Sequence, residues 1–382
     1  MKVIYLINGL GTGGAERSLA EMLPRLQDRG VAMTVLCLYQ KNQGVGSDLK
    51  RRGFDIRHLD AGSTVSRVMA VRSLLKSERP DVVHSTILEA NVVARLAAAG
   101  TGTPTLTSLV NTPYVSVRHH DPNIRPWKLG LVKQVDGWTA RRLTDHFHAI
   151  TQAVKDSAVA DLRIDPERVT VIPRGRDGER LGRKSPSRRR DARRALGLSD
   201  DALVLINVGR QERQKGQVHL LQAFQELADD YPTAVLLIAG RTGHSTPDIK
   251  TLVQRSQTLQ ERVLFLGHRT DVPDLLAASD VFVFPSLWEG LGGAAVEAMA
   301  LGLPIVASDV PALREITEEG ENATLVPPGK PTPLAAALRL HLDDGGLRRR
   351  YGLRSRAIYE STFTLGPVMD RMVDLYRLVR RG

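Results

Sequence analysis

Two glutamates, Glu289 and Glu297, enclose seven residues in the glycine-rich segment PSLWEGLGGAAVEAMALGLPIVASD. Eight residues along one helix correspond to about 12 Å of rise and about 80° of rotation. One helix therefore cannot direct both carboxylates into one small site. Gly290, Gly292 and Gly293 favour a loop at Glu289 and a helix around Glu297. The amides of Gly290 to Gly292, at the start of that helix, are suited to phosphate or sugar oxygens.

Glu297 lies in the apolar stretch AAVEAMA, where a carboxylate without a partner costs several kcal/mol. It therefore needs a hydrogen-bonding partner. The diol of a ribose is one candidate, because its two hydroxyls can donate to one carboxylate. The alternative is that Glu297 only complements the dipole at the helix N-terminus.

A second glycine cluster, GLGTGG at residues 9–14, follows the first apolar segment of the chain. Gly9, Gly11 and Gly14 match the G-x-G-x-x-G pattern, in which amides at a helix N-terminus hold a pyrophosphate. A dinucleotide-binding enzyme is thus one alternative, and a tight turn without a ligand is another. The acidic residue that binds the ribose of NAD is missing, because Tyr39, Gln40 and Lys41 stand where it is expected. Among dinucleotide-binding enzymes, only one that uses NADP remains compatible with this stretch, because Lys41 could meet the 2′-phosphate.

The elements that must position these residues are short apolar segments rich in β-branched residues, which alternate with helical segments. Such segments predict parallel strands covered by helices on both faces, and hence an α/β fold. The expected strands are residues 2–7, 32–38, 81–84, 105–110, 203–208, 234–239, 263–266, 281–284 and 304–307.

The alternation breaks once, in the polar, arginine-rich stretch 173–198. We expect a domain boundary here, formed by a solvated linker that leads into a basic helix. The predicted division is an N-terminal domain at 1–175, a C-terminal domain at 176–362 and a C-terminal amphipathic helix at 363–382 that returns toward the N-terminal domain. The apolar side of that helix would consist of Val368, Met372, Leu375, Leu378 and Val379. A ligand is expected in the cleft at the carboxyl ends of both sets of strands.

The composition indicates a globular protein with a preference for anionic partners. The 382 residues carry a formal charge of +11, 42% are hydrophobic and 25% are charged. A single cysteine, Cys37, excludes an internal disulfide framework and favours the cytoplasm. No apolar stretch approaches the roughly 20 residues that span a bilayer. The basic stretches lack the interleaved aromatic residues typical of nucleic-acid binding, so we expect no nucleic-acid partner.

Several ordered segments together resemble one family. They are GTGGAE at 11–16, VIPRG at 171–175, VGRQERQKG at 208–216, FLGHRTDVPDLLAASDVFVFPS at 265–286, and the Glu-x7-Glu segment with EAMALGLPIVAS. The sequence resembles the retaining GT-B glycosyltransferases of family 4, also called group 1. The resemblance implies two Rossmann-like domains that face a cleft. It also implies transfer of a sugar from a nucleoside-diphosphate sugar to an acceptor hydroxyl, with retention at the anomeric carbon and without a metal or other cofactor.

The resemblance also implies roles for individual residues. Arg210 and Lys215 would bind the donor diphosphate, and charge-assisted contacts of this kind contribute about 1.5 to 3 kcal/mol each. Glu297 would bind the ribose. The remaining donor-binding residues would be Gly13, Gly14, Gly267, Glu289, Gly290, Leu291 and Gly292. Arg210, Lys215 and Glu289 would act in catalysis, with Glu289 orienting the sugar and not serving as a nucleophile.

The sequence departs from the family in the half that is expected to bind the acceptor. Val110 or Asn111 stands where a histidine is common, and Arg174 replaces the asparagine of VIPNG. Asn111, His119 and His120 are the candidate acceptor residues. The expected acceptor is a glycan or a lipid-linked glycan. A nucleotide-sugar epimerase on the same fold and, less favoured, an NADP-dependent oxidoreductase remain as alternatives.

The stretch from residue 125 to residue 142, RPWKLGLVKQVDGWTARR, combines tryptophans and aliphatic residues with lysines and arginines at helical spacing. This composition is typical of an interfacial helix that binds anionic lipid, which would place the enzyme at the inner face of the membrane. A helix that faces the core and has a basic outer side is an equally valid interpretation.

Overall fold

The structure is a computed structural model that describes residues 1–41, 44–59, 62–115 and 125–381. The chain forms two compact units. The first consists of residues 1–176 together with residues 365–382, and the second consists of residues 177–364. Each unit contains one parallel sheet, so the expected α/β class with two Rossmann-like domains is confirmed.

The first unit contains a seven-stranded sheet in the order β3-β2-β1-β4-β5-β6-β7. All its printed strand pairs are parallel. Its strands are β1 (Lys2–Ile7), β2 (Ala32–Cys37), β3 (Asp55–His58), β4 (Val82–Thr86), β5 (Thr105–Leu109), β6 (His146–Ala149) and β7 (Val169–Val171). Its helices are α1 (Gly14–Gln27), α2 (Gly46–Arg51), α3 (Thr64–Glu78), α4 (Leu88–Ala98), α5 (Pro126–Leu143), α6 (Gln152–Leu162), the short η2 (Pro166–Arg168) and α17 (Leu365–Arg381).

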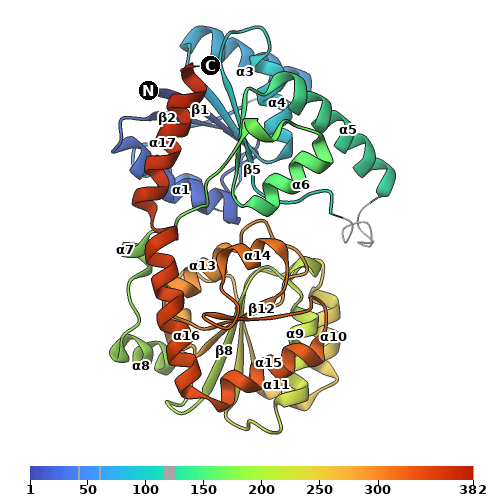
Figure 1. The fold of residues 1–382 in the computed structure, drawn as a ribbon, viewed down its shortest axis with the longest axis vertical. Helices are drawn as coiled ribbons and strands as arrows, with labels where there is room; N and C mark the ends of the chain where they lie inside the picture. Colours follow the sequence, from blue (N-terminus) through green and yellow to red (C-terminus); the bar gives the residue numbers. More distant parts are fainter. Residues whose placement is uncertain (42–43, 60–61, 116–124, 382) are drawn as a thin grey trace. The chain divides into compact units, whose positions relative to one another are not determined.

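Alternate residues of the central strand β1 serve two separate cores. Ile4 and Leu6 pack with α3 and α4 on one face of the sheet, whereas Val3 packs with α1 and α17 on the other. α1 and α17 are in contact and lie side by side in Figure 1. The last helix of the chain therefore belongs to the core of its first unit.

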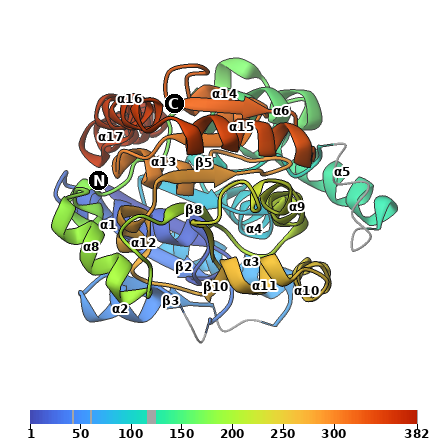
Figure 2. The ribbon, with the colours of Figure 1, turned by 90° about the horizontal axis from the view of Figure 1, so that it is seen from below.

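The second unit contains a six-stranded parallel sheet in the order β10-β9-β8-β11-β12-β13. Its strands are β8 (Leu203–Val208), β9 (Ala234–Ala239), β10 (Val263–Gly267), β11 (Val281–Phe284), β12 (Ile305–Ser308) and β13 (Ala323–Val326). Its helices are α7 (Gly178–Leu181), α8 (Pro186–Ala195), η3 (Arg213–Lys215), α9 (Gln217–Leu227), α10 (Thr246–Gln254), α11 (Gln257–Arg262), α12 (Val272–Ala278), α13 (Gly293–Ala300), α14 (Pro311–Ile316), α15 (Pro331–Asp343), α16 (Gly345–Ile358) and the single π turn η4 (Tyr359–Phe363). α9, α10, α11 and α15 share one buried apolar cluster with the sheet, and Figure 2 shows α10 beside α9 and α11.

Four strands were not expected from the sequence: β3, β6, β7 and β13. They are short, and β6 reads HFHA, which carries two histidines in place of apolar residues. Both histidines have hydrogen-bond partners. Half-buried His146 lies with its Nε2 2.8 Å from Thr170 Oγ1, and His148 is buried. His148 Nδ1 lies 2.9 Å from Ser108 Oγ, and His148 Nε2 lies 2.8 Å from the carbonyl oxygen of Ile172. A polar strand of this kind is compatible with burial because both ring nitrogens of the buried His148 have a partner.

The basic helix predicted in the stretch 173–198 is present as α8, but it lies within the second unit and is not simply solvated. Arg193 of α8 is fully buried, and its guanidinium lies 2.8 Å from a carboxylate oxygen of Asp280. Arg189 contacts the other oxygen of the same carboxylate, also at 2.8 Å. α8 is thus fixed to the second unit by ion pairs that apolar periodicity cannot predict.

α17 has the predicted amphipathic character, with one correction. Val368, Met372, Leu375 and Val379 are buried as expected, but Leu378 is 56% exposed. Tyr376, which was not expected in the core, is fully buried, and its hydroxyl lies 2.7 Å from His84 Nδ1. The helix therefore packs through a face that includes a polar contact to β4.

Candidate functional site

The strand order of the second sheet reverses between β8 and β11, the first and fourth strands of this unit. In doubly wound α/β sheets the loops that leave the carboxyl ends of such strands diverge and form a binding crevice. Here these loops are residues 209–216 after β8 and residues 285–292 after β11. The predicted residues Arg210, Lys215 and Glu289 all lie on these two loops.

Lys215 and Glu289 are brought together by the two loops. The Lys215 ammonium donates a short hydrogen bond to Glu289 Oε1 and lies 5.1 Å from the centre of the Phe284 ring. The side chains are only 18% and 8% exposed, so the pair is largely enclosed. The next residue, Gly216, has φ of +62°, and a Cβ at this position would collide with the carbonyl oxygen of Pro285. Glycine therefore permits the close approach of the two loops.

A polar network that the sequence analysis missed holds these loops in place. Gln217 Nε2 donates to Asn207 Oδ1 at 2.8 Å and to the Gly209 carbonyl at 3.0 Å. Asn207 Nδ2 in turn donates to the carbonyl of Val283 on β11 at 2.8 Å. Asn207 and Gln217 are each at most 1% exposed. Asn207 within an apolar strand was the signal that could have identified this network, because a buried amide requires partners.

The loop that carries Glu289 leads directly into α13. Gly290, Leu291 and Gly292 are buried, and Gly292 is the N-cap of the helix with φ of +87°. Glu289 thus lies on the loop and Glu297 on the helix, as predicted. At the start of this loop the Ser286 hydroxyl is buried without a hydrogen-bond partner among the described residues.

Glu297 is 8% exposed, and a carboxylate oxygen lies 3.7 Å from Arg180 Nη2. Arg180 belongs to α7, at the beginning of the second unit, and its side chain is 44% exposed. This partner could not be predicted from the sequence, because more than one hundred residues separate the two side chains in the chain. The ion pair supplies the partner that a carboxylate in an apolar helix requires.

Arg210 and Gly267 lie at the same edge of the sheet and are more open. The side chain of Arg210 is 63% exposed, and its ion pair with Glu212 is long, at 3.8 Å. Glu212 also accepts from His244 Nδ1 at 2.9 Å. Gly267 ends β10 with φ of +63°, and no atom lies within 4 Å of the position that a Cβ would take. The guanidinium of Arg210 is therefore accessible to an anionic ligand.

The other predicted residues belong to the first unit. Gly13 is the N-cap of α1 and Gly14 its first residue, so the glycine cluster joins strand and helix as predicted. The Glu16 carboxylate lies so close to Gly13 that a Cβ there would collide with it. Asn111 is exposed two residues after β5. His119 and His120 lie outside the described residues.

Arg174, the residue that departs from VIPNG, is unusual in its surroundings. It is 7% exposed, and its Nε is buried without a hydrogen-bond partner among the described residues. Burial lowers the pKa of Arg174, whereas nearby Tyr5 and Glu16 favour its charged form. Arg176 is 6% exposed but bonded, since its Nη1 donates to Ser18 Oγ at 3.1 Å and to the Gly175 carbonyl at 3.1 Å.

Two properties of the whole described chain bear on function. Within residues 1–41, 44–59, 62–115 and 125–381, no group of three or more histidine, cysteine, aspartate or glutamate side chains is arranged to hold a metal ion. In the same ranges, each helix is either too short or too polar to cross a bilayer.

Comparison with known proteins gives two matches that together extend over most of the chain. Residues 13–175 match the family described as glycosyl transferase 4-like domain, and residues 188–357 match the family described as glycosyl transferases group 1.

Two relatives are similar in sequence over most of the chain. UDP-Gal:alpha-D-GlcNAc-diphosphoundecaprenol alpha-1,3-galactosyltransferase of Escherichia coli is 30% identical over 261 residues, which are 66% of this chain and 64% of that enzyme. The match thus spans less than two thirds of that relative's length. Alpha-maltose-1-phosphate synthase of Mycobacterium tuberculosis is 29% identical over 314 residues, which are 78% of this chain and 79% of that enzyme.

Among solved structures, HepE of Anabaena in complex with UDP-glucose is similar to this chain in fold. The TM-score is 0.86 at 24% sequence identity, and the match covers 98% of this chain and 99% of that one. The order of strands, the matched family segments and this likeness agree, and the chain belongs to the group 1 glycosyl transferases of the GT-B fold.

Proposed function

We propose that the protein transfers a sugar from a nucleoside diphosphate to an acceptor hydroxyl, with retention of the anomeric configuration. The observation that carries this proposal is the enclosed Lys215–Glu289 pair, which lies where the loops after β8 and β11 meet. The fold neighbour HepE was solved with UDP-glucose, and the name of the E. coli relative specifies UDP-Gal as its donor. Both support a nucleotide sugar as the donor.

Donor binding in this proposal uses charges already present on the two loops. The diphosphate binds Lys215 and the exposed Arg210, while Glu289 orients the sugar through its hydroxyls. Glu297 accepts from the ribose hydroxyls, with Arg180 remaining beside it. Further donor contacts within the same unit come from Gly267, Gly290, Leu291 and Gly292.

In the proposed reaction the bond between the anomeric carbon and the diphosphate oxygen breaks. The acceptor oxygen forms a new bond to that carbon on the same face, and its proton passes to a phosphate oxygen of the donor. Negative charge accumulates on the departing diphosphate, and Lys215 and Arg210 stabilise it more strongly than the ground state. These two cations serve the role that a metal ion would otherwise have, so we propose a reaction without a metal cofactor.

The donor is tested by thermal unfolding with UDP, GDP, ADP and dTDP. A nucleotide at about 100 times its dissociation constant stabilises the protein by about 2.7 kcal/mol, which is readily measured. We expect one nucleotide to raise the midpoint, and Glu297→Ala to remove most of this increase. Glu321→Ala, which changes an exposed carboxylate outside the site, is the matched control. If none of the four nucleotides raises the midpoint, the proposed donor class is wrong.

Retention is tested on the product. The anomeric configuration of the sugar before and after transfer is read by NMR, and an inverted product contradicts the front-side mechanism. The same reaction without acceptor distinguishes the alternative of a nucleotide-sugar epimerase. Conversion of the nucleotide sugar into its epimer in the absence of any acceptor, without net release of the nucleoside diphosphate, supports that alternative, because transfer requires an acceptor hydroxyl.

We further propose that the acceptor is a glycan carried on a lipid, used at the inner face of the cytoplasmic membrane. The name of the E. coli relative specifies a diphosphoundecaprenol-linked acceptor. In this chain α5 exposes four large apolar side chains at successive turns: Trp127 at 65%, Leu131 at 56%, Val135 at 45% and Trp138 at 53%. These side chains do not face the core, in contrast to the alternative interpretation of this helix. Lys128 and Arg142 add positive charge to the same helix, which suits an anionic lipid surface.

Flotation with vesicles tests the membrane contact. We expect binding to vesicles of anionic phosphatidylglycerol at low salt and weak binding to phosphatidylcholine vesicles. Trp127→Ala with Trp138→Ala should reduce the bound fraction. Leu353→Ala, which changes an apolar residue of α16 that is even more exposed, at 75%, should not. Equal binding of all three proteins contradicts a role of α5.

A further inference from the structure

A second cavity lies in the same unit as the candidate donor site, at the opposite edge of its sheet. It has a volume of about 750 Å³. Asp280 and Pro304, which line it, directly precede β11 and β12, whereas the donor-site loops follow β8 and β11. The cavity therefore lies at the amino edge of the strands and is separate from the site described above.

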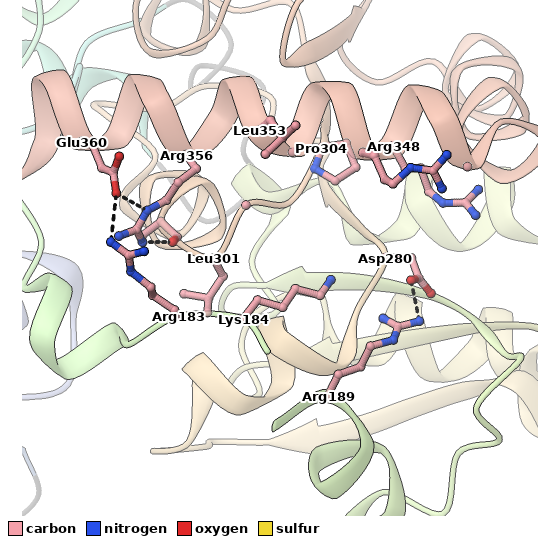
Figure 3. A pocket seen from close by; sticks show the side chains of 15 residues that line it. Arg183, Lys184, Arg189, Asp280, Leu301, Pro304, Arg348, Leu353, Arg356 and Glu360 are labelled. Carbon is pink, nitrogen blue, oxygen red and sulfur yellow. Dashed lines mark hydrogen bonds and ion pairs between the residues drawn. The ribbon is translucent and has the colours of Figure 1, made fainter. Parts of the chain in front are cut away.

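The lining of this cavity is strongly cationic. It contains six positively charged side chains, Arg183, Lys184, Arg189, Arg348, Arg349 and Arg356, and two carboxylates, those of Asp280 and Glu360. Figure 3 shows α16 on one side of the space, and Lys184 and Arg189 on the other side. Three different segments contribute the cations: the loop between α7 and α8, α8 itself, and α16.

The two carboxylates do not neutralise this charge, because each is shared by two arginines. Asp280 contacts Arg189 and Arg193 at 2.8 Å each. Glu360 contacts Arg356 at 2.8 Å and Arg183 at 3.8 Å. The two carboxylates are thus shared among four guanidinium groups.

Three of the cations have no carboxylate partner among the described residues. The ammonium of Lys184 donates to the carbonyl oxygen of Ser279 at 2.6 Å. Arg348 donates to the carbonyls of His341 and Leu342, the latter at 3.0 Å. Arg349 is exposed, and its side chain makes neither a hydrogen bond nor an ion pair within the described ranges. Hydrogen bonds to carbonyls position the first two cations but leave their charge uncompensated.

The lowered pKa of Lys184 agrees with this surplus of positive charge. Burial lowers the pKa of Lys184 to about 8, the charge of Asp280 raises it, and the positive charges of Arg189, Arg193 and Arg348 lower it again. A bound anion would compensate these cations. Gly345 and Arg348 of the first turn of α16 also line the cavity. The carboxylate of Asp344 caps this helix by accepting from the Leu347 amide at 2.9 Å, so the positive charge of the cavity comes from its side chains and not from the helix start.

We propose that this cavity binds a chain of two or three phosphate groups. Several guanidinium groups from separate segments suit a compact anion of multiple charge, because each can donate two parallel hydrogen bonds to phosphate oxygens. The apolar side chains of Leu301 and Leu353 leave room for an organic group on the same phosphates. The occupant is therefore either an inorganic polyphosphate or the phosphate chain of a nucleotide.

Calorimetric titration with inorganic tripolyphosphate tests this proposal. The donor site is first disabled by Arg210→Ala with Lys215→Ala, so that remaining binding reports the second cavity. We expect this background to bind one tripolyphosphate per chain, and Arg348→Gln with Arg349→Gln added to it to weaken binding at least tenfold. The matched control is Arg194→Gln with Arg350→Gln, which removes the same charge from α8 and α16 outside the cavity, and it should change the affinity less than twofold.

Two results would overturn the proposal. One is unchanged binding in the Arg348 and Arg349 variant, and the other is an equal loss in the control, which would mean non-specific attraction to a basic protein. If the Arg348 and Arg349 variant does not fold, Leu353→Glu replaces it, because this side chain is 75% exposed and a carboxylate there should repel the anion. Unchanged affinity in that variant also overturns the proposal. ATP binding more tightly than tripolyphosphate assigns the site to a nucleotide, and equal or weaker binding assigns it to inorganic polyphosphate.

Discussion

At the scale of single residues, the enclosed pair of Lys215 and Glu289 combines stability with function. The lysine neutralises a carboxylate that is only 8% exposed, and in the proposed reaction the same ammonium meets a diphosphate. A cation in this position is already in place when negative charge develops on the diphosphate. Such preorganised charge is the usual source of electrostatic catalysis. The pair therefore predicts a large effect on turnover when the lysine is removed.

We expect Lys215→Ala to lower kcat by roughly 100-fold to 1,000-fold, the range observed when one group that stabilises transition-state charge is removed. Steady-state kinetics of sugar transfer measure this effect. Lys250→Ala removes an exposed lysine of α10 and should leave kcat unchanged. A kcat that falls less than tenfold would assign Lys215 a structural role only.

Replacement of Arg174 is expected to change stability and activity in opposite directions. Its buried Nε has no partner within the described chain, so the charge is a cost to folding that hydrophobic replacement relieves. Arg174→Met should raise the unfolding midpoint and lower kcat/KM. Arg176→Met, which removes a guanidinium that is hydrogen-bonded, should lower the midpoint. If Arg174→Met lowers both the midpoint and kcat/KM, the side chain acts in folding and not in function.

At the scale of elements, α17 is tied to the sheet of the first unit by a chain of buried polar groups. The hydroxyl of Tyr376 contacts His84 at 2.7 Å, the other ring nitrogen of His84 contacts Ser108 Oγ at 2.7 Å, and Ser108 contacts His148 at 2.9 Å. Burial lowers the pKa of His148 to about 4, with Arg174 and Arg371 acting in the same direction against the hydrogen bond to Ile172. Burial also lowers the pKa of His84 well below its ordinary value.

A lowered histidine pKa makes the folded state less stable in acid. Between the ordinary pKa near 6.5 and the folded value near 4, the unfolded chain binds more protons, so stability falls as the pH falls through this window. For His148 alone the loss between pH 7 and pH 5 is about 2 kcal/mol. His148→Gln should therefore reduce the difference in unfolding free energy between these two pH values, measured with denaturant. An unchanged difference would mean that His148 does not titrate in this window.

Apolar elements could be predicted from the sequence, and polar ones could not. β1, β8, β9 and β11 have the predicted bounds, because continuous apolar runs between turn residues leave no alternative. β6 was missed because a segment with two histidines is usually exposed. The hydrogen-bond partners that allow His148 to be buried are far away in the sequence.

The same distinction applies to the candidate site. The loop position of Glu289 and the helical position of Glu297 follow from the local glycines, which restrict the backbone. The contact of Glu297 with Arg180 and the network around Asn207 depend on residues far apart in the chain. Such partners cannot be predicted from the sequence, because no local pattern indicates which distant side chain the fold places beside a given residue.

At the scale of the whole molecule, the two units differ in how the chain builds them. The second is one continuous stretch, residues 177–364, whereas the first needs both residues 1–176 and residues 365–382. Val3, Val82 and Leu106 of three different strands share a buried cluster with side chains of α17. Without α17 this apolar face would be exposed to water.

We therefore expect a fragment of residues 177–364 to fold by itself, and a fragment of residues 1–176 to remain aggregated or partly unfolded. Adding a peptide of residues 365–382 to the second fragment should restore its helical circular dichroism and its cooperative unfolding. A peptide in which Met369 and Met372 are replaced by serine is the control, because both side chains are buried in the cluster. Cooperative unfolding of residues 1–176 without any peptide would contradict this division.

The discontinuous first unit also has a consequence for protein synthesis. The ribosome must add the 188 residues of the second unit, 177–364, before it reaches the helix that completes the first. At about 5 to 20 residues per second this takes about 10 to 40 s. During this time the apolar side chains of the nascent N-terminal sheet that pack against α17 in the folded protein are open to water and to chaperones.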